Sequence, residues 1–256
     1  MSEKKIIVTG GAGYIGSHTV VELHNSGYTP IILDNLCNSS IDNIRGINKI
    51  IGEKIKWYNV DCTDYKEVYK IFSMENNILG IIHFAAFKSV EESINLPEKY
   101  HKNNVGSLKN ILNNMKKKNI NNIIFSSSCS IYGNVKGAVS ENKKPNPLGY
   151  YAYTKYKGEN LIKKYSKKIG YKYSILRYFN VAGASPSNKI GEIEKSHDHL
   201  FKNISIQALK KQPVVRIYGN NYKTKDGTCI RDFIHVSDLA GIHIKCINYL
   251  HKKKKS

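Results

Sequence analysis

The chain has 256 residues, 41% of them hydrophobic, which suits one large globular domain with a small appendage, and no apolar run is long enough to span a membrane. The formal net charge is +20, but only four of the 40 basic residues are arginine, the residue that most often reads bases and phosphates. Because the lysines are spread along the chain, we expect neither nucleic acid nor a membrane as a partner.

Apolar runs and helical patterns alternate along the first 180 residues. Continuous runs such as Ile6–Val8 and Ile81–Ile82 are typical of strands that are covered on both faces. The alternation predicts an α/β fold, a Rossmann-type doubly wound parallel sheet with helices on both sides. We expect strands at Lys5–Thr9, Thr29–Leu33, Ile55–Asn59, Gly80–Phe84, Asn122–Ser126 and Tyr173–Arg177, and helices at Tyr14–Ser26, Asp64–Asn76, Glu98–Lys118 and Tyr150–Ile169.

A glycine-rich segment follows the first predicted strand and opens the first helix. Gly10, Gly13 and Gly16 are spaced by three, which permits a tight turn and brings backbone N–H groups close to a pyrophosphate. Asp34 ends the second strand, where a carboxylate can accept hydrogen bonds from an adenosine ribose. Its negative charge would repel a 2′-phosphate, so the segment predicts NAD rather than NADP. Asp61, after the third strand, suits either an adenine contact or a helix cap.

A tyrosine and a lysine lie four residues apart on the predicted helix Tyr150–Ile169. Tyr151 and Lys155 therefore face the same side of the helix, one turn apart. A free tyrosine has a pKa of about 10, and we expect the ammonium, together with the positive charge of an oxidised nicotinamide, to lower that pKa. Tyr153 with Lys157 is a rival pair within the same segment.

Three adjacent serines, Ser126 to Ser128, end the fifth predicted strand, at the edge where sheets of this kind bind ligands. A serine there can hydrogen-bond the reacting hydroxyl and relay its proton to Tyr151. Chemistry alone leaves the choice among the three serines open. His83 lies inside an apolar strand, where we interpret it as a structural core histidine rather than a catalytic base.

The pattern becomes irregular after Asn180. We expect a helix at Leu200–Lys211, a short strand at Val214–Tyr218 and then a loop rich in Gly, Asn and Thr that leads to Arg231. Residues 1–180 are interpreted as an NAD-binding domain. Residues 181–256 are interpreted as a smaller substrate-binding region that is interleaved with the end of that domain.

The five cysteines are scattered along the chain and show no metal-binding spacing. We therefore expect reduced thiols, a cytoplasmic protein and no metal site. The cysteines are Cys37, Cys62, Cys129, Cys229 and Cys246.

Several segments, in the right order, resemble the extended short-chain dehydrogenase/reductase family and, within it, the UDP-glucose 4-epimerases. Related dehydratases and decarboxylases carry acids where this chain has Cys129 and Ser130, so the resemblance favours an epimerase. Family members continue well past Leu250, which implies a C-terminally short chain with an incomplete substrate region. The most specific segments are Val8–His18, Leu33–Ser39, His83–Lys88, Arg177–Asn180, Tyr218–Asn220 and Asp226–Val236.

The resemblance implies an NAD-dependent isomerase of galactose metabolism that inverts carbon 4 of a UDP-hexose through a transient 4-keto sugar. An NAD-binding homologue without turnover and an epimerase for another UDP-sugar are the alternatives. The resemblance further implies a homodimer that forms through Glu98–Lys118 and Tyr150–Ile169.

Residue roles follow from the resemblance position by position. Tyr151 would be the catalytic base, Lys155 its partner and Ser128 the hydroxyl relay. These three and the following residues would line NAD: Gly10, Gly13, Tyr14, Ile15, Gly16, Asp34, Asn35, Leu36, Cys37, Asn38, Ser39, Asp61, Cys62, Phe84, Ala85, Ala86, Phe87, Lys88, Asn103 and Phe179. The UDP-sugar would be held by Lys88, Ser128, Tyr151, Asn180, His199, Leu200, Tyr218 and Arg231.

Overall fold

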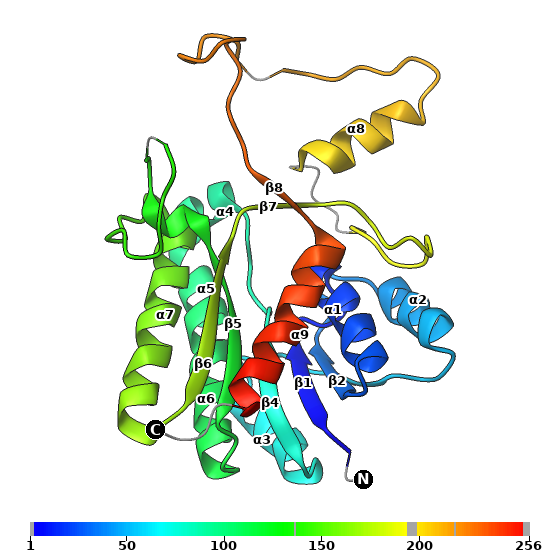
Figure 1. The fold of residues 1–256 in the computed structure, drawn as a ribbon, viewed down its shortest axis with the longest axis vertical. Helices are drawn as coiled ribbons and strands as arrows, with labels where there is room; N and C mark the ends of the chain where they lie inside the picture. The colour runs from blue at the N-terminus through cyan, green and yellow to red at the C-terminus, as the bar shows by residue number, and fades with distance from the viewer. Residues whose placement is uncertain (1–2, 136, 194–198, 218, 253–256) are drawn as a thin grey trace.

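The structure is a computed structural model that describes residues 3–135, 137–193, 199–217 and 219–252. Six parallel strands form the main sheet: β1 (Lys5–Thr9), β2 (Thr29–Asp34), β3 (Lys56–Asn59), β4 (Ile78–His83), β5 (Asn122–Ser128) and β6 (Lys172–Tyr178). Their order across the sheet is β3-β2-β1-β4-β5-β6 (Figure 1). The direction of winding changes between β1 and β4, and ligands bind such sheets at the carboxyl ends of the strands near this point.

The strands form the centre of the molecule because their residues are apolar on both faces. Ile7 and Ile81 belong to the core on one face, whereas Ile6, Val8 and Ile82 belong to the core on the other. All five side chains are fully buried. Alternate residues of a strand point to opposite faces, so a continuous apolar run fills both cores at once.

Helices cover both faces of the sheet (Figure 1). Three share the core that contains Ile7: α3 (Tyr65–Met74), α6 (Ser107–Lys117) and α7 (Tyr150–Ile169). Three share the core that contains Ile6: α1 (Tyr14–Asn25), α2 (Ile41–Ile51) and α9 (Val236–Lys252). Within the described part of the chain, no helix has the length and apolar character needed to cross a membrane.

The predicted α/β Rossmann-type fold is confirmed. Each of the six strands lies within two residues of its predicted bounds. The helix at Tyr150–Ile169 has the predicted bounds, and α1 and α3 are only slightly shorter than predicted. The division into domains at residue 180 stays a prediction. α9 lies within residues 181–256 and yet packs beside α1, β5 and β6 of the sheet region.

The single helix predicted at Glu98–Lys118 is wrong in its middle. α5 (Pro97–Tyr100) leads into a π-helix, η1 (His101–Gly106), before α6 begins. In the wider turn, the buried amide of Asn104 accepts a hydrogen bond from the Phe87 nitrogen at 2.8 Å and donates to the Phe87 oxygen at 3.0 Å. Insertions of this kind occur often at functional sites.

Several short elements and one long helix were missed by the sequence analysis. α9 is the largest of them, and its buried residues Leu239, Ile244, Ile247 and Leu250 recur at helical spacing. The shorter ones are α2, α4 (Val90–Asn95), the 3₁₀-helix η2 (Cys129–Tyr132), β7 (Asn180–Ala182) and β8 (Phe233–His235).

Apart from α9, the C-terminal region lies largely beyond the carboxyl end of the sheet (Figure 1). β7 pairs with β8 in a separate two-stranded sheet, and α8 (Leu200–Ala208) ends three residues before its predicted end. The strand predicted at Val214–Tyr218 is wrong for residues 214–217, which form no regular structure, and Tyr218 lies outside the described residues. The apolar side chains of this segment are exposed, and within the described part of the chain no strand pairs with it. The β propensity of these residues is therefore not enough to form a strand here.

Candidate active site

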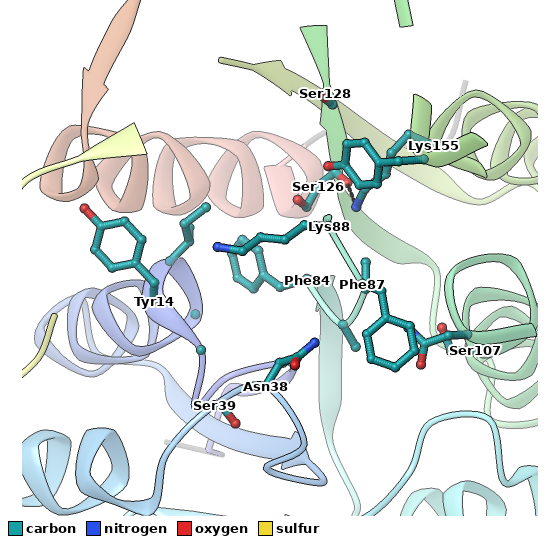
Figure 2. Close-up of a pocket in the computed structure, with 18 of the residues that line it drawn as sticks. Tyr14, Asn38, Ser39, Phe84, Phe87, Lys88, Ser107, Ser126, Ser128 and Lys155 are labelled. Carbon is teal, nitrogen blue, oxygen red and sulfur yellow. Dashed lines mark hydrogen bonds between the residues drawn. The ribbon is translucent and has the colours of Figure 1, made fainter. Parts of the chain in front are cut away.

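A cavity of about 420 Å³ opens at the carboxyl ends of the strands, a size typical of small-molecule sites. Figure 2 shows Tyr14, beside the glycine turn, on one side and Ser128 and Lys155 on the other, with Phe84 and Lys88 between them. The glycine motif and the Tyr-x-x-x-Lys motif, which are far apart in the sequence, therefore share one cavity.

The turn after β1 accepts only glycine at two positions. Gly10 has a φ of 69°, and a Cβ on it would lie 2.8 Å from the Ala85 nitrogen. A Cβ on Gly16 would lie 2.2 Å from the Gly10 oxygen. Because α1 begins at Tyr14, its free N–H groups and partial positive charge also face this end of the cavity. This cradle fits the pyrophosphate of a dinucleotide.

The carboxylate of Asp34 organises the neighbouring loop. It accepts hydrogen bonds from the backbone nitrogens of Ala12, at 3.0 Å, and Leu36, at 2.9 Å, and from the hydroxyl of Ser39, at 2.8 Å. Asp34 is buried and lines the cavity. A carboxylate has about four acceptor positions, so three internal bonds leave room for one ligand hydroxyl.

Lys155 is held against the end of β5. Its side chain is buried, and its Nζ donates to the Ser126 carbonyl oxygen at 2.8 Å, as the dashed line in Figure 2 marks. The same Nζ lies 5.8 Å from the centre of the Tyr151 ring. Burial lowers the pKa of Lys155 to about 8, so the lysine still carries most of its charge at neutral pH.

The phenol of Tyr151 lies beside the hydroxyl of Ser128. Burial raises the pKa of Tyr151 to about 12, and the hydrogen bond with Ser128 opposes that rise. Among the chain's own residues, Lys155 does not produce the lowered pKa that the sequence suggested, because removal of the phenol from water dominates. The second cation in that expectation, the oxidised nicotinamide, stays a prediction.

The three serines at the end of β5 have three different partners. Ser126 shares a hydrogen bond with the phenol at the end of β6, and Ser127 donates to the carboxylate of Glu159 at 2.7 Å. Ser128 is the serine that interacts with Tyr151. Ser128, to which the resemblance assigns the relay, therefore lies beside Tyr151, and the relay role stays a prediction.

Two rival residues lie elsewhere. Tyr153 is on the outer side of α7 with Lys157 over its ring, and it does not line the cavity. His83 is buried in β4 and bonds to the Thr9 hydroxyl at 2.8 Å. Burial, with a smaller effect from the Lys155 charge, lowers the pKa of His83 to about 3.

Most of the predicted cofactor residues lie in the wall of the cavity. Leu36 does not, because its side chain packs against the core beside α1. Those that do are Gly10, Gly13, Tyr14, Ile15, Gly16, Asp34, Asn35, Cys37, Asn38, Ser39, Asp61, Cys62, Phe84, Ala85, Ala86, Phe87, Lys88, Asn103, Ser128, Tyr151, Lys155 and Phe179.

The predicted substrate residues are divided by the structure. Lys88, Ser128, Tyr151, Asn180 and His199 line the cavity. Leu200 and Arg231 do not line it; both are exposed, and the Arg231 guanidinium donates to the neighbouring Ile230 oxygen. Tyr218 lies outside the described residues. The substrate-binding roles of all eight residues stay predictions.

The wall also contains residues to which the sequence analysis gave no role. Tyr178 is the clearest, because it directly ends β6, and a strand end was the signal that could have found it. These residues are Leu33, Val60, Val90, Ser107, Tyr178 and Val181, and the wall also contains Ser126 and Ser127, the other two candidate serines, with Cys129 and Ser130 after them.

Comparisons with known proteins agree with this geometry. The chain matches the NAD dependent epimerase/dehydratase family over residues 6–255. It is 42% identical over 256 residues to a UDP-glucose 4-epimerase of Dictyostelium discoideum. The matched segment covers 99% of this chain and 74% of that relative.

Two solved structures are also similar over nearly the whole chain. The UDP-glucose-4-epimerase from Stenotrophomonas maltophila with bound NAD and formylated UDP-arabinopyranose is 34% identical with a TM-score of 0.92, over 98% of this chain and 75% of that one. The UDP-glucose 4-epimerase from Bifidobacterium longum in complex with NAD+ and UDP is 36% identical with a TM-score of 0.91, over 99% and 76%. The chain thus spans about three quarters of the length of these relatives.

Proposed function

The chain belongs to the NAD dependent epimerase/dehydratase family, and we propose that it interconverts UDP-glucose and UDP-galactose by inverting carbon 4 through a transient 4-keto sugar. The observation that carries this proposal is one cavity with Tyr151, Lys155 and Ser128 at one end and the glycine turn at the other. The relatives with known activity are UDP-glucose 4-epimerases, which supports this substrate class.

NAD is the cofactor that the residues of the cavity fit. The glycine turn and the start of α1 would hold its pyrophosphate, and Asp34 would accept a hydrogen bond from its ribose. The segment Phe84–Lys88 and Asn103 line the adjoining wall. When bound, NAD supplies the hydride acceptor and donor and, when oxidised, a positive charge near the phenol.

Three residues handle the proton of the sugar. Tyr151 takes the proton of the 4-hydroxyl and returns it after the sugar has turned over. Ser128, in contact with the phenol, orients the hydroxyl and relays its proton. Lys155, fixed by the Ser126 carbonyl, keeps an ammonium beside the phenol. Because burial alone raises the pKa of Tyr151 to about 12, the reaction needs added positive charge to make the phenol a base.

The UDP moiety is held at the rim where the two regions of the chain meet. Asn180, at the start of β7, and His199, just before α8, supply hydrogen-bonding groups from the C-terminal region. Lys88 supplies a positive charge from the loop after β4. We include Leu200, Tyr218 and Arg231 as further contacts, since an arginine can bridge diphosphate oxygens with two hydrogen bonds.

We also infer a homodimer in the cytoplasm. The helices at Glu98–Lys118 and Tyr150–Ile169 are the proposed contact, and Ile94, Leu96 and Tyr153 next to them are exposed apolar side chains. The cysteines are free thiols, as expected in a reducing compartment. Light scattering coupled to size exclusion should give twice the mass of the chain.

A coupled assay for conversion of UDP-galactose to UDP-glucose tests the proposed activity. We expect turnover by the NAD-loaded wild type and a kcat about 10³-fold lower in Tyr151→Phe, because the variant lacks the proton acceptor. NAD content and circular dichroism should not change. Tyr153→Phe on the same helix is the matched control and should keep full activity. A folded, NAD-loaded wild type without turnover would contradict the assignment and leave an NAD-binding protein.

A further inference from the structure

Helix α7 presents three functional groups to the end of β5. Tyr151, Lys155 and Glu159 are spaced by four residues, so they lie on one face of the helix. Each meets a different member of the serine triplet at residues 126–128. Tyr151 meets the hydroxyl of Ser128, and Lys155 donates to the carbonyl oxygen of Ser126. Glu159 accepts a hydrogen bond from the hydroxyl of Ser127. The mechanism above uses the first two contacts and leaves Glu159 without a role.

Glu159 is a fully buried carboxylate with strong partners. It accepts hydrogen bonds from Ser127 Oγ at 2.7 Å and from Arg177 Nε and Nη2 at 2.8 and 2.6 Å. Burial raises the pKa of Glu159, but the bonds from Arg177 and Ser127 outweigh burial and hold the pKa below its ordinary value. The group is therefore ionised and held in a two-pronged pair, which fixes direction as well as distance.

Arg177 extends this contact over both neighbouring strands. It stands opposite Ser127 in the register of β5 and β6, so Glu159 is bonded to two strands at the same level. The guanidinium also donates to the Tyr132 hydroxyl at 2.7 Å and to the Glu141 oxygen at 3.0 Å. Tyr132 lies in η2, directly after β5, so the same ion pair holds the chain on both sides of the catalytic serine.

We propose that Glu159 is a positioning residue for the epimerisation. Its bonds to Ser127 and Arg177 fix the position of α7 along β5, and this position sets the distance between Tyr151 and Ser128. The inference rests on the proposed function. Glu159 does not line the cavity and acts only through other residues. Replacing a buried ion pair by apolar side chains often leaves stability unchanged or raises it. We therefore assign to this pair a role in fixing the position of α7 along β5 rather than a role in stability.

Two variants and one control test this role in the NAD-loaded protein. Glu159→Gln removes the charge. Ser127→Ala, at a residue that also lines the cavity, removes the link to β5 and leaves the ion pair intact. Lys163→Met is the control, since Lys163 approaches the same carboxylate at 3.7 Å from the next turn of α7 and its own side chain is partly exposed. A displacement of about 1 Å costs about 10²-fold in rate, so we expect kcat to fall about 10²-fold in Glu159→Gln and about tenfold in Ser127→Ala.

The following results would distinguish a positioning role from a purely structural one. We expect KM for UDP-galactose and NAD content to stay within about twofold of wild type, and the acidic limb of the kcat/KM profile to move to higher pH, since the bond from Ser128 that lowers the pKa of Tyr151 is loosened. Lys163→Met should match wild type. Wild-type kcat and pH profile in folded Ser127→Ala and Glu159→Gln, or an equal loss in Lys163→Met, would overturn the proposal.

The proposal can still be tested if Glu159→Gln does not fold or if the wild type shows no turnover. If Glu159→Gln does not fold, Ser127→Ala decides, because it leaves no unpaired buried charge. If the wild type shows no turnover, the proposed function fails, and the titration of the Tyr151 phenol by ¹³C NMR, assigned with Tyr151→Phe, decides the positioning role separately. An unchanged phenol titration in Ser127→Ala would then reject it.

Discussion

The two regions of the molecule differ in how much of their structure is fixed by packing. The sheet β1 to β6 and its helices contain two continuous cores of buried side chains. In contrast, α8 has no buried residue, and Leu209 at its end is 90% exposed. Apart from α9 and Ile190, which belong to the second core, the C-terminal region meets the sheet region through single contacts, such as the bond from Tyr14 to the Gly183 oxygen at 2.5 Å.

This difference separates two tasks of the site. The groups proposed to handle the proton stand on α7 and β5, where packing and hydrogen bonds hold them in place. The groups proposed to hold the nucleotide come in part from the loosely packed region, and elements that bind ligands are often drawn from the less stable parts of a fold. The comparison predicts large effects of substitution on the first side and small effects on the second.

The largest effect is expected from truncating a core leucine. Leu112→Ala on α6 removes a fully buried side chain and should lower the free energy of unfolding by about 2–5 kcal/mol. Leu209→Ala, the same substitution at the end of α8, should change it by less than about 0.5 kcal/mol. Urea unfolding of both variants measures the difference. Equal losses would show that the C-terminal region is packed as firmly as the sheet.

The same contrast explains which elements could be predicted from sequence. The strands of the sheet combine apolar runs with burial on both faces, so local pattern and final structure agree. The segment at residues 214–217 has the same β-branched character but lacks a partner, and its prediction failed. The break at η1 depends on a bond between Asn104 and Phe87, residues of different elements, which no local pattern records.

The candidate site divides in the same way. Spacing alone predicted the glycine turn, Asp34 and the pair of Tyr151 and Lys155, because each motif is local and its geometry follows from strand or helix repeats. Which of the three neighbouring hydroxyls meets Tyr151, rather than another residue of α7, depends on the assembled fold. The raised pKa of Tyr151 depended on burial, which only the assembled fold determines.

A second effect, on pH dependence, should arise from the buried ammonium of the packed region. The pKa of Lys155 is about 8 in the folded chain and above 10 when unfolded, so between about pH 8 and 10 the unfolded chain binds more protons. The contribution of Lys155 to stability should therefore rise with pH over this window, by about 3 kcal/mol in total.

Urea unfolding of wild type and Lys155→Met across this window isolates the contribution of the lysine. The rise should be absent in the variant, which has no proton to lose. Tyr151 does not obscure the measurement, because its raised pKa of about 12 reduces stability only above about pH 10. Parallel profiles for the two proteins would show that the ammonium is not buried in the way the structure has it.

The smallest effect is expected at the junction of the two regions. His199 lines the cavity from the C-terminal side and contacts the carboxylate of Glu192, which also lies 3.8 Å from Lys88 Nζ. His199→Ala should raise KM for UDP-galactose about three- to tenfold, the value of one hydrogen bond, and leave kcat unchanged. Ser205→Ala on α8, which removes only an exposed bond to Phe201, is the control.

The split between KM and kcat is what makes this last variant informative. If His199 only holds the nucleotide, the transition state and the bound substrate lose the same contact, so the loss is confined to KM. A fall in kcat with unchanged KM would mean that the loosely packed region also sets the geometry of the reacting carbon. In that case the division of tasks between the two regions would be wrong, because positioning would not be confined to α7 and β5.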